Sequence, residues 1–372
     1  MKIVEVEIYL VAMPLIEPFR TAFGTVETIE SVFVHMITDD AEGWGESTPQ
    51  AGPFYSAEWA RGCFTLIRDW LAPIMVGKEV ASGQELQRLL APVKGNFFAK
   101  AALDLAWWDA YARALGRPMW RLIGGANPSV DVGEDIGLMD SVDALLDRVD
   151  QAQRAGMKRI KIKVMPGWDM EILSRVREAH PAAVIHIDCN GAYSLDDLPR
   201  LREFDHFGLA MIEQPLAHDD LVDHARLQQE LSTPLCLDEC IVSVAKARKA
   251  IELGAARWIN IKLGRVGGLT NAIDIHSTCV AMNIPCWAGF MIESALGQAQ
   301  TMALATLPNM RYPADIFPSR RFYLEDLSEP EIEMSGPSAV CATDELGFGR
   351  KPNPRRLAKQ TIGTAIIRRT ST

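Results

Sequence analysis

Residues 184–238 read VIHIDCNGAYSLDDLPRLREFDHFGLAMIEQPLAHDDLVDHARLQQELSTPLCLD. This stretch contains three short apolar runs, Val184–Asp188, Leu209–Glu213 and Pro234–Asp238, with segments of helical periodicity between them. Short apolar strands that alternate with amphipathic helices predict βαβ units and therefore a parallel sheet. Each run ends in a carboxylate, at a constant interval of 25 residues.

The same alternation continues on both sides of this stretch. Eight strands are expected in all, at Val130–Ile136, Arg159–Val164, Val184–Asp188, Leu209–Glu213, Pro234–Asp238, Arg257–Lys262, Ile284–Ala288 and Met310–Asp315. Helical segments lie between them, for example at Asp140–Ala155, Asp169–Ala179, Ser194–Phe204, Asp219–Leu231, Val242–Leu253 and Gly268–Met282. Eight βα units of this length predict an α/β fold with a (β/α)₈-type barrel over residues 127–327.

Charged residues close five of these strands. Lys163 precedes the three carboxylates Asp188, Glu213 and Asp238, and Lys262 follows them, each about one βα unit after the last. The C-terminal ends of barrel strands meet at one mouth, where the active sites of this fold lie. All five side chains are therefore expected to converge there.

The three carboxylates have the chemistry of a cation site. Hard oxygen ligands on consecutive strands suit Mg²⁺, with Mn²⁺ as an alternative. Burying Asp188, Glu213 and Asp238 without a cation would cost several kcal/mol per charge. Lys161 and Lys163 are two residues apart on one strand, so both are expected to point inward beside this site.

A lysine on either side of a bound carboxylate substrate allows proton transfer at the α-carbon. Lys163 or Lys262 would remove the α-proton while the cation stabilises the enediolate. A lysine base needs a pKa of about 7–8 instead of about 10.4, and we expect the cation and Lys161 to lower it by like-charge repulsion. Two bases on opposite faces permit racemisation or epimerisation.

The first 126 residues have a different pattern. Two alternating runs, Lys2–Leu10 and Ser31–Ile37, predict an antiparallel meander, and Glu17–Thr25 between them is expected to be a loop. Helical periodicity follows at Ala57–Leu71, Gly83–Leu90 and Phe97–Leu115. These elements predict an α+β domain over residues 1–126, which ends at a glycine-rich joint.

Composition and charge exclude several classes of protein. The net charge of −10 argues against nucleic acid as a partner, because phosphate binding needs clustered positive charge. No uninterrupted apolar run predicts a membrane span, and the alternating N-terminus does not resemble a signal peptide. Seven cysteines without a Cys-x-x-Cys pair indicate reduced thiols and a cytoplasmic location.

Several motifs together resemble the enolase superfamily, in its muconate-lactonising branch. They are Lys161-x-Lys163, Asp188-Cys189-Asn190, Glu213-Gln214-Pro215, Asp238-Glu239 and residues 262–268, KLGRVGG. Residues 18–25 (PFRTAFGT), 52–56 (GPFYS) and 213–227 (EQPLAHDDLVDHARL) are similar to the N-acylamino acid racemase and o-succinylbenzoate synthase group. The resemblance covers nearly the whole chain.

The resemblance implies roles for individual residues. It implies Mg²⁺ on Asp188, Glu213 and Asp238, with Lys163 and Lys262 as the two bases. It also implies that Lys161 contacts the substrate carboxylate and that Asn190 supports it. The N-terminal domain would cap the barrel and shape the pocket through loops carrying Phe19, Phe23 and Tyr55. Residues 328–372 would return to this cap, and the chain would form a homo-oligomer.

Three departures from this group bear on the substrate. Leu263 stands where the group has proline, and Asp135 where it has serine. Phe290 replaces a glycine in the run of residues 289–294, GFMIES, so that Phe290 and Met291 would line a reshaped pocket. Under the plainer interpretation, Phe290 packs away from the pocket and Asp135 is a helix N-cap.

Several activities remain open at this point. The first is racemisation of an N-acyl amino acid such as an N-succinyl derivative, and the second is dehydration of a β-hydroxy acid as in o-succinylbenzoate formation. The departures also allow a shifted, cationic substrate. A Schiff-base aldolase would use Lys163 or Lys262 but would leave the carboxylates without a purpose, and a non-catalytic protein would not need five charged residues in register.

Overall fold

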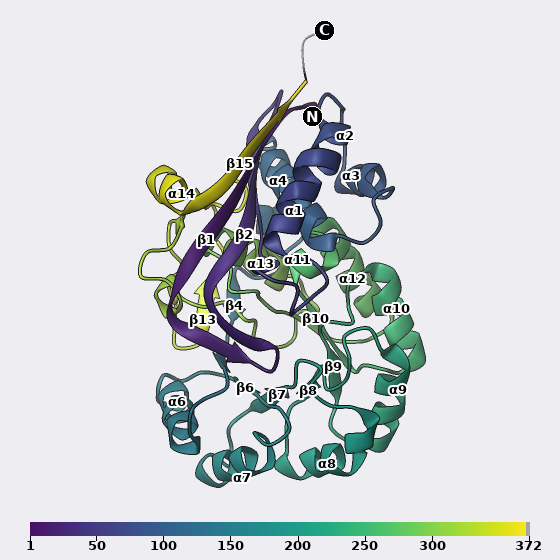
Figure 1. Cartoon of the computed structure of the whole chain (residues 1–372), viewed down its shortest axis with the longest axis vertical. Helices are drawn as coiled ribbons and strands as arrows, with labels where there is room; N and C mark the ends of the chain where they lie inside the picture. Colours follow the sequence, from purple (N-terminus) through teal and green to yellow (C-terminus); the bar gives the residue numbers. More distant parts are fainter. Residues whose placement is uncertain (370–372) are drawn as a thin grey trace.

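Two layers of structure are visible in the computed structural model, which describes residues 1–369 (Figure 1). The antiparallel strands β1, β2 and β15 and helices α1–α4 form the upper part of the view, and the strands and helices of the barrel form the lower part. The expected α/β architecture with an α+β cap is confirmed, whereas the exact divisions at residues 126 and 327 stay predictions. No helix in the described part is long and apolar enough to cross a membrane.

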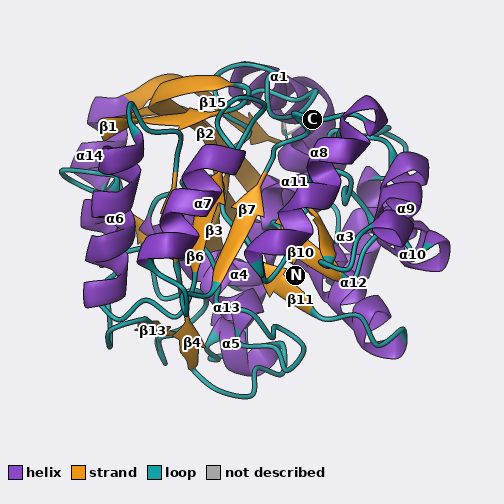
Figure 2. Ribbon diagram, turned by 90° about the horizontal axis from the view of Figure 1, so that it is seen from below, coloured by secondary structure: helices purple, strands orange, loops and turns teal. Residues whose placement is uncertain are grey.

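The barrel is built on seven parallel strands that follow one another in chain order from β5 to β11. They are β5 (Glu134–Ile136), β6 (Ile160–Lys163), β7 (Ile185–Asp188), β8 (Ile212–Glu213), β9 (Leu235–Leu237), β10 (Trp258–Ile261) and β11 (Cys286–Ala288). The helices that alternate with them are α6 (Val142–Arg154), α7 (Met170–Ala179), α8 (Leu198–Glu203), α9 (Leu221–Glu230), α10 (Val244–Leu253), α12 (Leu269–Ala281) and α13 (Ala295–Ala305). Figure 2 shows helices such as α6, α7 and α9 arranged around these strands.

The closure of the barrel differs from the expected regular eighth strand. Met310–Asp315 joins its neighbours by isolated parallel bridges, from Met310 to Cys286 and from Ala314 to Val132. Pro313 lies in this segment and has no N–H to donate, which limits the ladder that can form. The segment nevertheless connects the two edges of the curled sheet and completes the barrel.

The expected first strand, Val130–Ile136, is also broken in two. Its first part, β4 (Ser129–Asp131), pairs antiparallel with β13 (Ala339–Cys341), and only β5 joins the barrel sheet. Gly133 lies at the break, where a Cβ atom would stand 2.3 Å from Nε of Arg159. The glycine therefore makes room for the Arg159 side chain, which crosses the strand at this point.

The cap sheet has the strand order β15-β1-β2-β3. Its strands are β1 (Ile3–Thr21), β2 (Gly24–Thr38), β3 (Glu42–Ser47) and β15 (Thr361–Arg368). The expected loop at Glu17–Thr25 is wrong, because β1 and β2 continue as a hairpin to a turn at residues 22 and 23. Prolines 14 and 18 disturb the register between them without ending the hairpin.

Helices follow the first three strands of the cap in the chain, and several of them pack against the cap sheet (Figure 1). They are α1 (Ala60–Leu66), the π-helical turn η1 (Ile67–Leu71), α2 (Ala72–Met75), α3 (Gly83–Leu90), α4 (Phe97–Ala114) and α5 (Met119–Leu122). The remaining short elements are α11 (Leu263–Val266), α14 (Pro354–Gln360), β12 (Ser328–Glu329) and β14 (Lys351–Pro352). The predicted helices Gly83–Leu90 and Phe97–Leu115 are confirmed, and Ala57–Leu71 is divided between α1 and η1.

Helix α4 joins the cap to the barrel. Thr270, in the first turn of α12, donates through its N–H and its hydroxyl to the buried carboxylate of Asp104. On the other side of the interface, Glu46 of β3 accepts hydrogen bonds from the N–H groups of Ser294 and Gly297 at the start of α13. These bonds fix the position of the cap over the mouth of the barrel.

The close packing of β3 on α4 gives a stability prediction. A Cβ atom at Gly45 would lie 2.2 Å from the carbonyl oxygen of Ala102 and 2.5 Å from the nitrogen of Ala106, both backbone atoms. Gly45→Ala should therefore lower the free energy of unfolding by about 3 kcal/mol, measured by urea denaturation. Gly336→Ala is the control, because the nearest atom to its Cβ would be 3.8 Å away, and equal stability of the two variants would contradict this packing.

Candidate active site

A small cavity lies at the C-terminal mouth of the barrel, under the β1–β2 hairpin. The residues that line it include both predicted bases and every predicted substrate contact: Lys163, Lys262, Lys161, Asn190, Asp135, Phe19, Phe23, Tyr55, Phe290 and Met291. Thr21, Val26, Gln50 and Ile292 complete the lining, and none of these four was predicted. The structure thus brings side chains from the cap hairpin, the 50–55 loop and the barrel strands to one place.

Lys161 and Lys163 both point from β6 into the barrel, as their spacing predicts. Lys163 Nζ donates to Asp188 Oδ2 at 2.5 Å, across neighbouring positions of β6 and β7. Lys161 Nζ is surrounded by four carboxylates: Asp315 at 2.7 Å, Asp135 at 3.2 Å, Asp188 at 3.7 Å and Glu213 at 3.8 Å. One ammonium group is therefore shared by most of the acidic side chains of the site.

Lys262 belongs to a second cluster on the opposite side of the mouth. Its Nζ donates to Asp238 Oδ2 at 2.9 Å and to the hydroxyl oxygen of Tyr55 at 3.2 Å. Tyr55 in turn donates to Asp238 at 3.1 Å, so that the cap reaches directly to a predicted metal ligand. Arg265 pairs with Asp238 as well and donates to Tyr55 at 2.8 Å.

Arg265 and Asp315 are functional neighbours that sequence reasoning missed. Arg265 follows Lys262 by three residues, and the short helix α11 turns it back under the site, which its place in a glycine-rich segment did not reveal. Asp315 ends the expected eighth strand, so the signal used for the other strand ends was present and was not applied. It pairs with Arg159 and Lys161 and holds both in place.

The charges of the protein do not give the expected lowering of the lysine pKa values. Burial acts to lower the pKa of Lys163 and of Lys262, but the carboxylate paired with each reverses the direction. Asp188 raises the pKa of Lys163 above its usual value, and Asp238 raises that of Lys262 well above it. A direct ion pair with a carboxylate stabilises the ammonium form more than the like charge of Lys161 destabilises it.

The three predicted metal ligands lie on neighbouring strands and are completely buried. Asp188 and Glu213 are directly paired in register, and Asp238 follows the end of β9. Within residues 1–369 no three acidic, histidine or cysteine side chains form a ready-made cation cage. Lysine and arginine groups contact Asp188 and Asp238. Glu213 Oε2 accepts no hydrogen bond from the described residues, while Asn260 donates to Oε1 at 2.6 Å.

This donor set fits a hard divalent cation. Three anionic oxygen donors suit Mg²⁺, and Oε2 of Glu213, which accepts no hydrogen bond from the described residues, is available to the cation. Burial raises the pKa of Glu213, with Lys161 opposing this effect and Asp238 adding to it. The acidic cluster is therefore one that additional positive charge would stabilise.

Asp135 and Phe290 are the two departures whose plainer interpretations the structure does not fully support, because both residues line the cavity. Asp135 is on β5 and points inward beside Lys161, and Ser141 is the N-cap of α6, so Asp135 is not a helix cap. Phe290 lines the cavity and also packs on the rings of Phe317 and Phe322, at centroid distances of 4.6 and 5.5 Å. Phe290 therefore both lines the cavity and packs against neighbouring aromatic rings.

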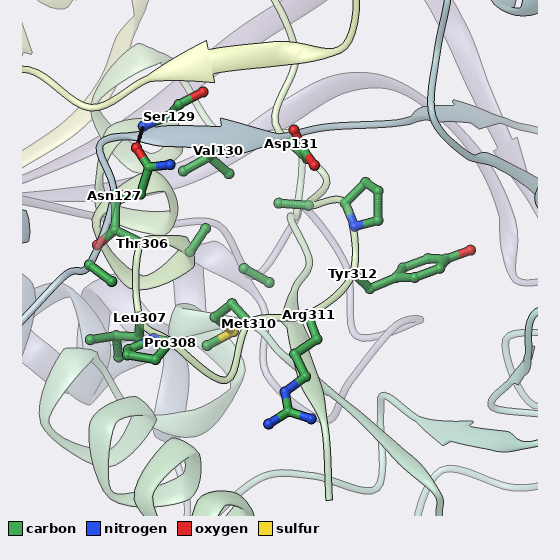
Figure 3. A pocket seen from close by; sticks show the side chains of 15 residues that line it. Asn127, Ser129, Val130, Asp131, Thr306, Leu307, Pro308, Met310, Arg311 and Tyr312 are labelled. Atoms are coloured by element: carbon green, nitrogen blue, oxygen red, sulfur yellow. Dashed lines mark hydrogen bonds between the residues drawn. The ribbon is translucent and has the colours of Figure 1, made fainter.

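A second hollow lies beside the segment that closes the barrel, between β4 and the end of α13 (Figure 3). Its labelled side chains include Asn127, Asp131, Thr306, Arg311 and Tyr312. None of the predicted bases or metal ligands lines it. The cavity under the cap hairpin is lined by both predicted bases, each paired with a carboxylate, and it is the candidate active site.

Two family descriptions match the chain. "Mandelate racemase / muconate lactonizing enzyme, N-terminal domain" matches residues 3–124, and "Enolase C-terminal domain-like" matches residues 144–356. An N-succinylamino acid racemase from Amycolatopsis sp is 43% identical over 99% of this chain and 100% of the relative. An o-succinylbenzoate synthase from Geobacillus kaustophilus is 41% identical over 97% of this chain and 96% of the relative.

Solved structures agree with these matches. An enolase superfamily member from Listeria innocua is 34% identical, with a TM-score of 0.95 and coverage of 99% of both chains. The N-succinyl Arg/Lys racemase from Bacillus cereus is 25% identical, with a TM-score of 0.92 over 99% of this chain and 100% of that one. The similarity therefore includes the cap and the barrel together.

Proposed function

Because this chain belongs to the mandelate racemase and muconate lactonizing enzyme family of the enolase superfamily, we propose that it removes the α-proton of a carboxylate substrate and returns a proton to the same carbon. The substrate class proposed first is the N-acyl amino acids, including N-succinyl derivatives. The observation that carries the proposal is the placement of Lys163 and Lys262 on opposite sides of one cavity, each beside a different buried carboxylate.

Asp188, Glu213 and Asp238 would hold the divalent cation, Mg²⁺ or Mn²⁺. When bound, the cation supplies positive charge that makes the α-proton of the substrate acidic enough for an amine to remove. A cation bound by Asp188 and Asp238 would share the negative charge of these carboxylates with the lysines. The carboxylates would then stabilise the ammonium forms of Lys163 and Lys262 less. The pairing seen between them thus marks the contact that must loosen before a lysine acts as a base.

The two lysines divide the proton transfer between them. One lysine in its neutral form accepts the α-proton, and the ammonium of the other donates a proton from the opposite face, which inverts the configuration. Lys161 would hold the substrate carboxylate, supported by Asn190, which lines the same cavity. Tyr55 and the hairpin residues Phe19 and Phe23 cover the site and exclude water during this exchange.

Dehydration is the second candidate, supported by the relatives named o-succinylbenzoate synthase. It begins with the same removal of an α-proton and then expels a β-hydroxyl group. The test is incubation with Mg²⁺ in D₂O with N-succinyl and N-acetyl amino acids and with a β-hydroxy acid. Loss of the α-proton signal by NMR supports the proposal, alkene formation identifies dehydration, and neither reaction from any compound contradicts both.

Phe290 gives a prediction about the size of the substrate. Phe290→Gly removes the ring that separates the cavity from Phe317 and Phe322, so we expect bulkier N-acyl groups to be accepted. The kcat/KM for an N-benzoyl amino acid should rise at least about tenfold relative to the N-acetyl compound. Phe317→Leu is the control for altered packing behind the ring, and an unchanged acyl profile in Phe290→Gly would refute a role in specificity.

We also propose a cytoplasmic location and a homo-oligomer. The location is supported by the seven free cysteines, six of which are buried in the core. The oligomer is supported by an apolar surface on the cap helices, where Trp59, Trp70 and Ile74 are exposed. Size-exclusion chromatography with light scattering measures the oligomeric state directly.

A further inference from the structure

Asp135 is an acidic side chain of the cavity that the proposed proton transfer does not use. Only 1% of the residue is exposed, and it lines the cavity together with Lys161, Phe19 and Phe290. Its Oδ2 faces Lys161 at 3.2 Å, whereas its Oδ1 is buried and has no hydrogen-bond partner among the described residues. A buried carboxylate oxygen without a donor is costly unless a ligand supplies the donor.

Asp135 shares its ion-pair partner with other carboxylates. Lys161 is the cation within ion-pair distance of it in residues 1–369, and Asp315 lies closer to that ammonium, at 2.7 Å. Asp188 and Glu213 share the same ammonium at 3.7 and 3.8 Å. A second carboxylate on the substrate would add negative charge beside these acidic side chains, whereas a positively charged group would be attracted to them.

The position of Asp135 in the barrel shows which part of the substrate it meets. The predicted metal ligands lie on β7, β8 and β9, while Asp135 is on β5, beyond the strand that carries Lys163. In the proposed function the α-carboxylate lies at the cation and the α-carbon between the lysines, so the rest of the substrate would extend towards β5 and β11. There it meets Asp135 together with the rings of Phe19 and Phe290.

Aromatic rings beside one carboxylate are a surface that favours a cationic nitrogen. The faces of aromatic rings attract ammonium and alkylammonium groups, and the carboxylate accepts their N–H bonds. The same rings give an anionic group no hydrogen bonds. Two observations point to the same chemistry: Asp135 Oδ1 has no hydrogen-bond partner among the described residues, and Phe19 and Phe290 line the same cavity as Asp135.

We propose that the part of the substrate beside Asp135 carries a cationic nitrogen and not a second carboxylate. The substrate class is then an α-carboxylate with a positively charged group on its side chain or N-acyl chain. This inference rests on the proposed function for the orientation of the substrate. It predicts that the chain does not prefer simple N-succinyl amino acids with apolar side chains.

The test uses two matched ligand series that differ only in charge. Leucine carries a succinyl, pentanoyl or 4-aminobutanoyl group on its nitrogen in the first series, and the second comprises N-acetyl derivatives of glutamate, norleucine and lysine. Affinity is measured with Mg²⁺ present by calorimetric titration, and α-proton exchange in D₂O is followed separately. In at least one series we expect the cationic member to bind about tenfold or more tightly than the anionic one.

Asp135→Asn should remove this preference while keeping the shape of the side chain. Asp131→Asn is the control, because Asp131 is a half-exposed carboxylate in β4, just before β5, and pairs with Lys158. Preference for the anionic ligand in both series, or an unchanged preference in Asp135→Asn, would overturn the inference. Charge-selective binding without α-proton exchange would instead refute the proposed function and leave the charge preference standing. The comparison of ligands on the wild-type protein does not depend on whether a variant folds.

Discussion

Racemisation will stop when either Lys163 or Lys262 is replaced by alanine. Each replacement removes one of the two groups that transfer protons on opposite faces of the α-carbon, so we expect a fall in kcat of about 10³-fold or more. The measurement is the loss of optical rotation of a single enantiomer in the presence of Mg²⁺. Lys246→Ala, at an exposed position in α10, is the control and should keep full activity.

The two variants should differ in what they retain. A site with one remaining base can still remove the α-proton of one enantiomer and return a deuteron to the same face. We therefore expect each variant to exchange the α-proton of one enantiomer in D₂O without inverting it, and the two variants to choose opposite enantiomers. Normal racemisation by either variant, or exchange of the same enantiomer by both, would contradict the assignment of two bases.

Glu213→Gln should abolish both cation binding and activity. The amide keeps the size of the side chain and can still accept the hydrogen bond from Asn260, but it removes a negative charge and the carboxylate oxygen Oε2 that is available to the cation. We expect the affinity for Mg²⁺, measured by calorimetry, to fall at least about 100-fold and catalysis to become undetectable.

Thermal unfolding separates loss of the cation from loss of the fold. Saturating Mg²⁺ should raise the Tm of the wild-type protein, because a ligand that binds only the folded state stabilises it. The Tm of Glu213→Gln should not respond to Mg²⁺. Glu203→Gln, on the exposed end of α8, is the control and should respond as the wild type does, whereas an equal response of Glu213→Gln would show that Glu213 is not a ligand.

The barrel was predictable because two signals in the sequence mark each of its central strands. An apolar run of strand length identifies the strand, and a charged residue at its end identifies the mouth, as at Asp188, Glu213 and Asp238. The same regularity located the site, since residues one βα unit apart must meet at one end of the barrel. Periodicity is a local property of the sequence, but here it was sufficient to predict how the strands are arranged in the barrel.

The parts that could not be predicted depend on contacts between distant residues. Residue 133, at the break of the first strand, has no room for a side chain because Arg159 passes beside it, and no local pattern contains that information. The hairpin tip at Glu17–Thr25 looks like a loop because of its prolines and glycine, yet pairing along both strands outweighs these signals. The direction of the lysine pKa values likewise depends on which carboxylate each ammonium finally meets, at distances that spacing does not give.

The pairing of β15 with β1 has a consequence for the order of folding. The sheet of the cap needs a strand from near each end of the chain, so β1 has one open edge during synthesis until more than 350 residues have been made. An open strand edge invites pairing with another nascent chain. The barrel helices, by contrast, can form from local contacts as they emerge. The open edge of β1 is covered only when β15 pairs with it.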